Sequence, residues 1–231
     1  MKTCLFILVT LMCFVPKKGY SQQYKLKTEI QSTFIDITGL FGVNEPASIT
    51  QFTYTNKGFG LDLYHGFSLQ NFGKSIQTII TPSYTFKLDQ QGKFFLKPKA
   101  EIAHLELSGG GFIRPGYHFI YKPNAKNIFN LGNWGFIDLR DEAKYPKRLN
   151  GYTFLLSYTH YDDFGKWRLI EEARVLFVDI LETLKVSGAF GNIQLTYQPL
   201  GVFVGANAVY TYYRSDNKNE LFWNIAVGKQ F

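Results

Sequence analysis

Histidine is the side chain that most often carries acid–base or metal chemistry near neutral pH, and this 231-residue sequence contains His65, His104, His118 and His160. No two of them are four residues apart, the spacing that places two imidazoles on one helix face around a metal ion. A serine or aspartate could act with a histidine, but the groups must meet within about 3 Å, and no spacing here specifies such a pair. The sequence therefore predicts no catalytic residue, no metal site and no cofactor.

Residues 1–21 have the organisation of a secretory signal peptide. Lys2 precedes an apolar stretch at 4–15, which is too short to cross about 30 Å of hydrocarbon as a helix. Gly19 and Ser21 predict cleavage after Ser21, which leaves 22–231 as a single domain.

Removal of this leader changes the chemistry that the chain can offer. Both cysteines, Cys4 and Cys13, lie in the leader, so the mature chain excludes disulfides and thiolate sites. Its 22 basic and 18 acidic residues give +4, compared with +7 for the whole sequence. The sequence has no Lys/Arg cluster of the kind that binds nucleic acid, so we expect no binding to a nucleic-acid polymer. Gly109–Gly111 lacks the Lys-Ser or Lys-Thr that a phosphate loop requires, so we expect a turn there.

The mature sequence alternates between apolar and polar residues over many short stretches, which is the pattern of β-strands. With 17% aromatic and 19% charged residues, the composition excludes a collagen, a coiled coil or a disordered tail. Turn-forming residues divide the chain into twelve predicted strands, at 24–37, 48–55, 58–70, 75–88, 93–107, 111–122, 127–138, 151–161, 167–180, 191–198, 201–213 and 220–231.

Alternation alone fits two architectures, because an apolar face can be the core of a soluble sandwich or the lipid-facing wall of a membrane barrel. Strand length favours the barrel, since several strands exceed the 9–11 residues that a tilted membrane strand needs. Connection length favours it too. Tight turns at 55–58, 89–93, 122–127, 162–166 and 198–201 alternate with connections that include the long 38–47, 138–150 and 181–190. We therefore predict an all-β fold, an antiparallel transmembrane β-barrel of twelve strands.

One segment, 168–185, also has the pattern of a helix. Leu169, Ala173 and Leu176 share one face at a spacing of 3.6 residues, and Glu172, Asp179 and Glu182 lie on the opposite face. The number of strands favours a strand here, because bacterial single-chain barrels have an even number of strands and this segment brings the number to twelve. A helix here would leave a barrel of ten strands, or eight, with a helical insert.

The C-terminal strand carries a resemblance to a known class. Its outward residues and its last residue resemble the assembly signal of Gram-negative outer-membrane β-barrel proteins; these are Trp223, Ile225, Val227 and Phe231. Lys229 departs from the pattern, which has an apolar or aromatic residue at that position. The resemblance implies export to the outer membrane of a Gram-negative bacterium, with outer-membrane lipid and the barrel-assembly machinery as partners.

If the apolar faces meet lipid, the polar faces line the lumen and contain both signs of charge. The predicted lumen-lining residues are Asp62, Tyr64, Lys97, Lys99, Glu101, Arg114, His118, Glu172, Arg174, Gln194, Asn207 and Asn224. Such a surface could be a salt-bridged filling that makes the wall rigid, or a narrow path for a polar solute. Twelve strands leave room for a small solute, whereas eight are filled by side chains.

The C-terminal third resembles the nucleoside-specific channel family, through EEARVLFVDI at 171–180 followed by GVFVGANAVYTYY at 201–213. The resemblance implies a twelve-strand outer-membrane channel, but it assigns no binding residue. We therefore predict a passive pore or channel for small polar solutes. The alternatives are an outer-membrane lipid hydrolase, and a structural or adhesion barrel that acts through its extracellular loops such as 138–150.

Overall fold

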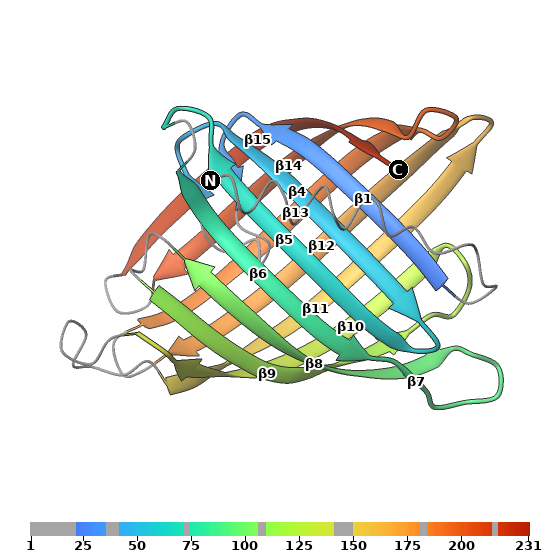
Figure 1. Cartoon of the computed structure of the whole chain (residues 1–231), viewed down its shortest axis with the longest axis horizontal. Helices are drawn as coiled ribbons and strands as arrows, with labels where there is room; N and C mark the ends of the chain where they lie inside the picture. The colour runs from blue at the N-terminus through green and yellow to red at the C-terminus, as the bar shows by residue number, and fades with distance from the viewer. Residues whose placement is uncertain are drawn as a thin grey trace.

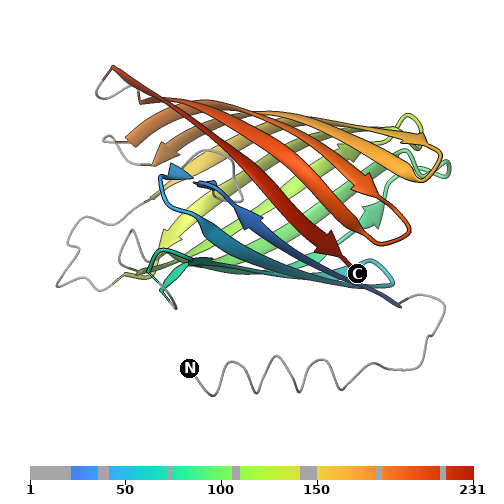
Figure 2. The ribbon, with the colours of Figure 1, turned by 90° about the horizontal axis from the view of Figure 1, so that it is seen from above.

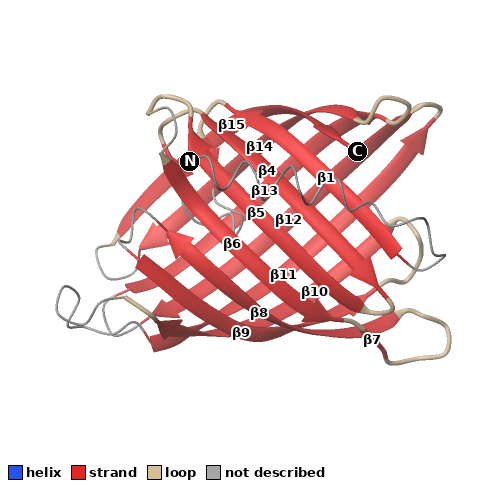
Figure 3. Ribbon diagram, in the orientation of Figure 1, coloured by secondary structure: helices blue, strands red, loops and turns tan. Residues whose placement is uncertain are grey.

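A computed structural model of the chain describes residues 22–35, 42–71, 74–105, 110–140, 150–180, 184–213 and 217–231. The predicted signal peptide, 1–21, lies outside these residues. Figure 3 shows that the described elements are all strands. They are β1 (Gln22–Gln31), β2 (Phe34–Ile35), β3 (Gly42–Val43), β4 (Ala47–Asn56), β5 (Phe59–Ser68), β6 (Ser75–Tyr84), β7 (Phe86–Lys87), β8 (Phe94–Leu105), β9 (Gly110–Tyr121), β10 (Asn127–Asp138), β11 (Asn150–Phe164), β12 (Trp167–Ile180), β13 (Leu184–Tyr197), β14 (Val202–Tyr213) and β15 (Lys218–Gln230).

The strands form a closed antiparallel barrel. Each wall strand pairs with its neighbours in chain order, and β1 pairs with β15 to complete the ring (Figures 1 and 2). β6 and β7 both pair with β8 and are two parts of one wall strand, interrupted at Thr85. The wall therefore has twelve strands, as predicted. β2 and β3 form a separate small hairpin.

The segment with the helical pattern is a strand. β12 pairs along its whole length with β11 on one edge and with β13 on the other. These two ladders satisfy its backbone groups on both edges, which outweighs the helix propensity of its side chains. The expected loop at 181–190 is wrong in extent, because β13 begins at Leu184 and continues the ladder from there.

Side chains alternate between the two faces of the wall, and β15 shows this most clearly. Trp223, Ile225 and Val227 are 64%, 52% and 50% exposed on the outer face, whereas Asn224 and Ala226 between them are buried on the inner face. On the outer face, a row of aromatic rings crosses the four adjacent strands β8–β11: Phe94, Tyr121, Phe129 and Tyr158, with successive centroids 4.7, 6.1 and 4.9 Å apart. Such a band is typical of an interfacial aromatic girdle.

One end of the barrel, here called the tight-turn end, carries the five short connections that the sequence predicts, at 57–58, 88–93, 122–126, 165–166 and 198–201. Gly201 has a φ of 65°, and a Cβ there would lie 2.0 Å from the carbonyl oxygen of Gln230, so this turn requires glycine. In the 88–93 turn, the backbone N–H groups of Lys93 and Phe94 donate to Asp89 Oδ1, which lowers the pKa of that carboxyl group.

The opposite end, here called the long-connection end, carries the remaining connections, of which 32–46, with β2 and β3 inside it, is the longest and 139–149 the next. Most of 139–149 lies outside the described residues. Among the residues that are described, no helix is long and apolar enough to cross a membrane.

A charge on the outer face tests whether that face meets hydrocarbon. Val175 is 39% exposed and lies on the outer face of β12. We expect Val175→Lys to lower the free energy of unfolding by about 2–4 kcal/mol, because a lysine in the hydrocarbon layer loses hydration. The measurement is a urea titration of the barrel refolded into phospholipid vesicles. Lys166→Ala, in an exposed turn, is the control, and an equally small effect in both variants would contradict a lipid-facing wall.

Candidate functional site

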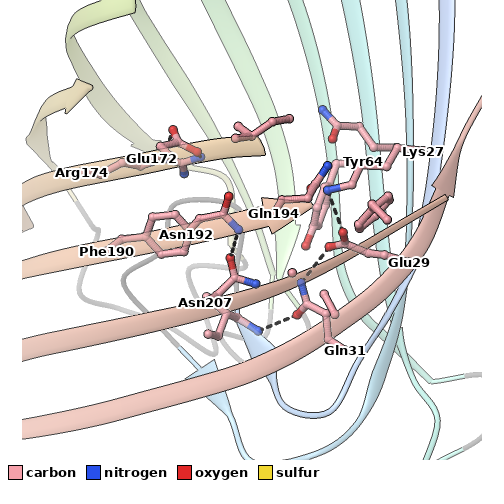
Figure 4. Close-up of a pocket in the computed structure, with 16 residues that line it drawn as sticks. Lys27, Glu29, Gln31, Tyr64, Glu172, Arg174, Phe190, Asn192, Gln194 and Asn207 are labelled. Carbon is pink, nitrogen blue, oxygen red and sulfur yellow. Dashed lines mark hydrogen bonds and ion pairs between the residues drawn. The ribbon is translucent and has the colours of Figure 1, made fainter. Parts of the chain in front are cut away.

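The interior of the barrel contains two adjoining polar cavities. The β1-side cavity has a volume of about 210 Å³ and is lined by residues of β1, β4, β5 and β12–β15, including Lys27, Glu29, Asn192 and Asn207 (Figure 4). The β8-side cavity has a volume of about 450 Å³ and is lined mainly by residues of β5, β6 and β8–β12. Gln51, Glu172 and Arg174 line both cavities, so the two lie next to each other inside the barrel.

The structure places the twelve predicted lumen residues at this interior. Ten of them line one or both cavities: Asp62, Tyr64, Lys97, Lys99, Glu101, His118, Glu172, Arg174, Gln194 and Asn207. The other two contact a lining residue, since Arg114 forms an ion pair with Glu101 and Asn224 accepts a hydrogen bond from Asn207. The strand period of two explains this, because every second side chain on a strand points to the same face. That these residues contact a solute stays a prediction.

The luminal charges form ion pairs with one another. Lys27 contacts Glu29 at 2.7 Å, and Lys99 and Arg114 both contact Glu101. The Arg174 guanidinium donates two hydrogen bonds to Glu172, at 2.6 and 2.8 Å. Three cations also lie over aromatic rings: Lys27 over Phe203, Lys99 over Trp134 and Arg174 over Phe190, at 4.5–4.7 Å from the ring centroids. This pairing makes the inner wall rigid and stabilises charges that are largely removed from water.

A ladder of amides crosses three adjacent strands at the same register. Asn192 Nδ2 donates to Asn207 Oδ1 at 2.6 Å, and Asn207 Nδ2 donates to Asn224 Oδ1 at 2.7 Å (Figure 4 shows the first of these bonds). Asn224 Nδ2 then donates to the backbone carbonyl of Thr33 at 2.7 Å. The ladder therefore connects the wall to the segment that follows β1.

That segment folds into the barrel and forms part of its filling. The side chain of Phe34 is 2% exposed and packs in a cluster with Ala47, Ile49, Tyr64, Ile76, Ile79 and Ala103. A Cβ on Gly66 would lie 3.0 Å from the Phe34 ring, so glycine leaves the space that the ring occupies. The predicted strand 24–37 is wrong at this point, because β1 ends at Gln31. The adjacent apolar pair Phe34 and Ile35 breaks the alternation and is the sequence signal for this departure.

A second apolar cluster lies on the other half of the inner wall and contains Trp134, Leu155, Leu176, Val178 and Val186. Val178 and Val186 flank the β12–β13 connection, and Phe34 follows the corresponding end of β1, so both clusters reach the long-connection end. The interior is therefore closely packed at that end, where buried polar residues such as Gln77 and Asp138 lie among the apolar clusters, and hollow beyond it. Period-two alternation implies a uniformly polar inner face. This expectation is wrong for the packed part, where the two apolar clusters lie.

Three of the four histidines hydrogen-bond to uncharged neighbours. His65 Nδ1 lies 2.9 Å from Thr78 Oγ1, His118 Nδ1 lies 2.8 Å from Asn130 Oδ1, and His160 Nδ1 lies 2.9 Å from Asn127 Oδ1. Across the described ranges, no serine hydrogen-bonds to a histidine and no group of three potential metal ligands converges.

Comparison with solved structures identifies the fold. The NanC porin structure has a TM-score of 0.59 and 12% sequence identity over 90% of this chain and 99% of that one. The chain has the fold of an outer-membrane β-barrel. The outer membrane protein Omp33 and the outer membrane channel DcaP, both of Acinetobacter baumannii, have TM-scores of 0.44, with 10% and 9% identity over 93% of this chain and 99% of each of theirs. The assignment rests on the first structure. No family model and no curated protein matches the sequence.

The four residues that resemble an assembly signal lie where that role requires. Trp223, Ile225, Val227 and Phe231 are all exposed, at 50–64%, and the first three lie on the outer face of β15. Recognition by an assembly machinery stays a prediction.

Removal of the middle amide tests the ladder. We expect Asn207→Leu to lower the free energy of unfolding by about 1–3 kcal/mol, because Asn192 and Asn224 each lose a buried partner. The measurement is again urea unfolding in vesicles. Asn219→Ala is the matched control, since Asn219 is an exposed amide that donates only to Tyr210 on the outer face. Equal stability of the two variants would contradict the ladder as a structural element.

Proposed function

We propose that this chain is a passive channel for small polar solutes in the outer membrane of a Gram-negative bacterium. The observation that supports the proposal most strongly is the polar interior of the closed barrel, where ion pairs and amides line two adjoining cavities. Charged and amide side chains inside a barrel replace part of the hydration of a polar solute, which lowers the barrier to its passage. The same proposal makes outer-membrane lipid and the barrel-assembly machinery the partners of this chain.

The dimensions of the interior support a small solute. Cavities of about 210 and 450 Å³ are of the size that holds a single small molecule, and neither is wide enough for a polymer. Phe34 and its apolar neighbours narrow the path at the long-connection end. We therefore expect a low conductance, limited by that packed region.

The alternatives from the sequence have less support. A lipid hydrolase needs a nucleophile beside a histidine, and the serines of the described ranges form no such pair. An adhesion barrel would act through loops such as 138–150, and 141–149 of that loop lie outside the described residues. A structural barrel would also contain paired charges, but it does not require the polar cavities that lie beside them.

Current through planar bilayers tests the proposed channel. We expect refolded, heat-modifiable protein to produce small, discrete conductance steps, and Phe34→Ala to raise the step size severalfold, because the ring fills space inside the barrel. Phe177→Ala is the control, since Phe177 lies on the outer face and is 41% exposed. Folded wild-type protein that inserts without conductance would contradict the channel, and an unchanged step in Phe34→Ala would contradict Phe34 as part of the constriction.

A further inference from the structure

The Lys97–Asp62 pair differs from the other luminal ion pairs. Its N–O distance is 3.8 Å, beyond hydrogen-bond range, whereas the other luminal pairs are in direct contact. The Lys97 and Asp62 side chains are 30% and 25% exposed, well above the 6–12% of Lys99, Glu101 and Arg114 and similar to the directly paired cations of β1 and β12, so the distance is what sets this pair apart. Both charged groups therefore lie open to the β8-side cavity and retain capacity for a further partner.

The wall holds these two charges at a fixed separation. Asp62 lies on β5 and Lys97 on β8, with β6 between them, so the pair spans one intervening strand. Thr53 Oγ1 donates to Asp62 Oδ1 at 2.6 Å, which orients the carboxylate and leaves Oδ2 toward Lys97. The opposite charges are thus presented side by side across one strand of the inner wall.

The β8-side cavity has no net charge that would favour anions over cations. Its lining contains three basic side chains and three carboxylates, so it is neutral overall. A simple anion that binds Lys97 lies beside the like charge of Asp62, which costs free energy, and a simple cation at Asp62 has the converse cost beside Lys97. A solute with both charges avoids this cost, because its carboxylate meets Lys97 while its ammonium group meets Asp62.

Polar groups without partners lie beside the pair. Within the described part of the chain, His118 Nε2 and the indole Nε1 of Trp134 are buried and have no hydrogen-bond partner. Trp134 is 4% exposed, and both residues line the same cavity. Both rings form the cavity wall beside Lys97, so a solute bound there would pack against them.

From this arrangement we infer that Lys97 and Asp62 form a binding site for small zwitterionic solutes of the α-amino-acid class. The inference rests on the proposed channel function and assigns a substrate class to it. The carboxylate of the solute pairs with Lys97 Nζ, its ammonium group pairs with Asp62 Oδ2, and its uncharged part lies toward Thr81 and His118 in the cavity.

Block of the ion current by added solute tests the site. We expect L-alanine to reduce the single-channel current at lower concentration than acetate or ethylammonium, which carry only one of its two charges. Lys97→Gln and Asp62→Asn should each raise the half-blocking concentration at least about tenfold, as expected for loss of one charge-assisted hydrogen bond. The exchange variant Asp62→Lys/Lys97→Asp should recover most of the block. Lys122→Ala is the matched control, since Lys122 lies over Phe95 and lines neither cavity.

Two results would overturn the site while the channel stands: normal conductance with equal block by alanine and the single-charge ions, or unchanged block in both single variants. If folded wild-type protein shows no conductance, the channel is wrong, and isothermal titration of L-alanine into the barrel in detergent decides the site separately. Binding by wild type and its loss in Lys97→Gln would support the site, and absence of binding by wild type would overturn it. If a single variant does not fold, the half-blocking concentration of L-alanine is compared between the exchange variant and wild type.

Discussion

Closure of the sheet is the constraint on which the rest of this structure depends. Within hydrocarbon, a backbone N–H or C=O group without a partner costs several kcal/mol, so a membrane-spanning sheet has no open edge. Here the first and last wall strands pair from Lys27↔Gln230 to Gln31↔Ala226, and Leu26 and Phe231 exchange two further backbone hydrogen bonds. The same closure divides the side chains into an outer set that must be apolar and an inner set that can be polar.

The polar groups of the inner set must then find most of their hydrogen-bond and ion-pair partners within the barrel, because only a small volume remains for water. Its charges lie next to opposite charges on the same strand, on a neighbouring strand or, for Lys97 and Asp62, across one strand, and its amides form a ladder that ends on the backbone of Thr33. Where pairing ends, apolar side chains fill the space, and Phe34 adds an aromatic ring from a segment that leaves the wall. The result is an interior that is packed at one end and hollow with balanced charges beyond it, which suits slow passage of a small solute better than bulk flow.

The fold could be predicted from the sequence because strands have a side-chain period of two. The alternation identifies the twelve wall strands and places residues such as Lys99 and Glu101 on one face without knowledge of any partner. Other features depend on contacts between distant segments. β12 has a helical pattern, and only its two ladders decide that it is a strand. Lys97 and Asp62 are 35 positions apart in the sequence. They come within 3.8 Å of each other because β6 pairs with both of their strands and fixes the register between them. The inward turn after Gln31 depends on the space at Gly66, which no local pattern shows.

The most direct test of a lipid-facing outer wall around a water-filled path uses the absence of cysteine from residues 22–231. Gln51 lines both cavities, and its neighbour Thr50 points to the outer face of β4. Single variants Gln51→Cys and Thr50→Cys, inserted in bilayers, can be exposed to a charged, membrane-impermeant thiosulfonate while current is recorded. We expect the reagent to modify Gln51→Cys and lower its current, and to leave the current of Thr50→Cys unchanged. Modification of Thr50→Cys with no reaction at Gln51→Cys would contradict a lipid-facing wall around a water-filled path.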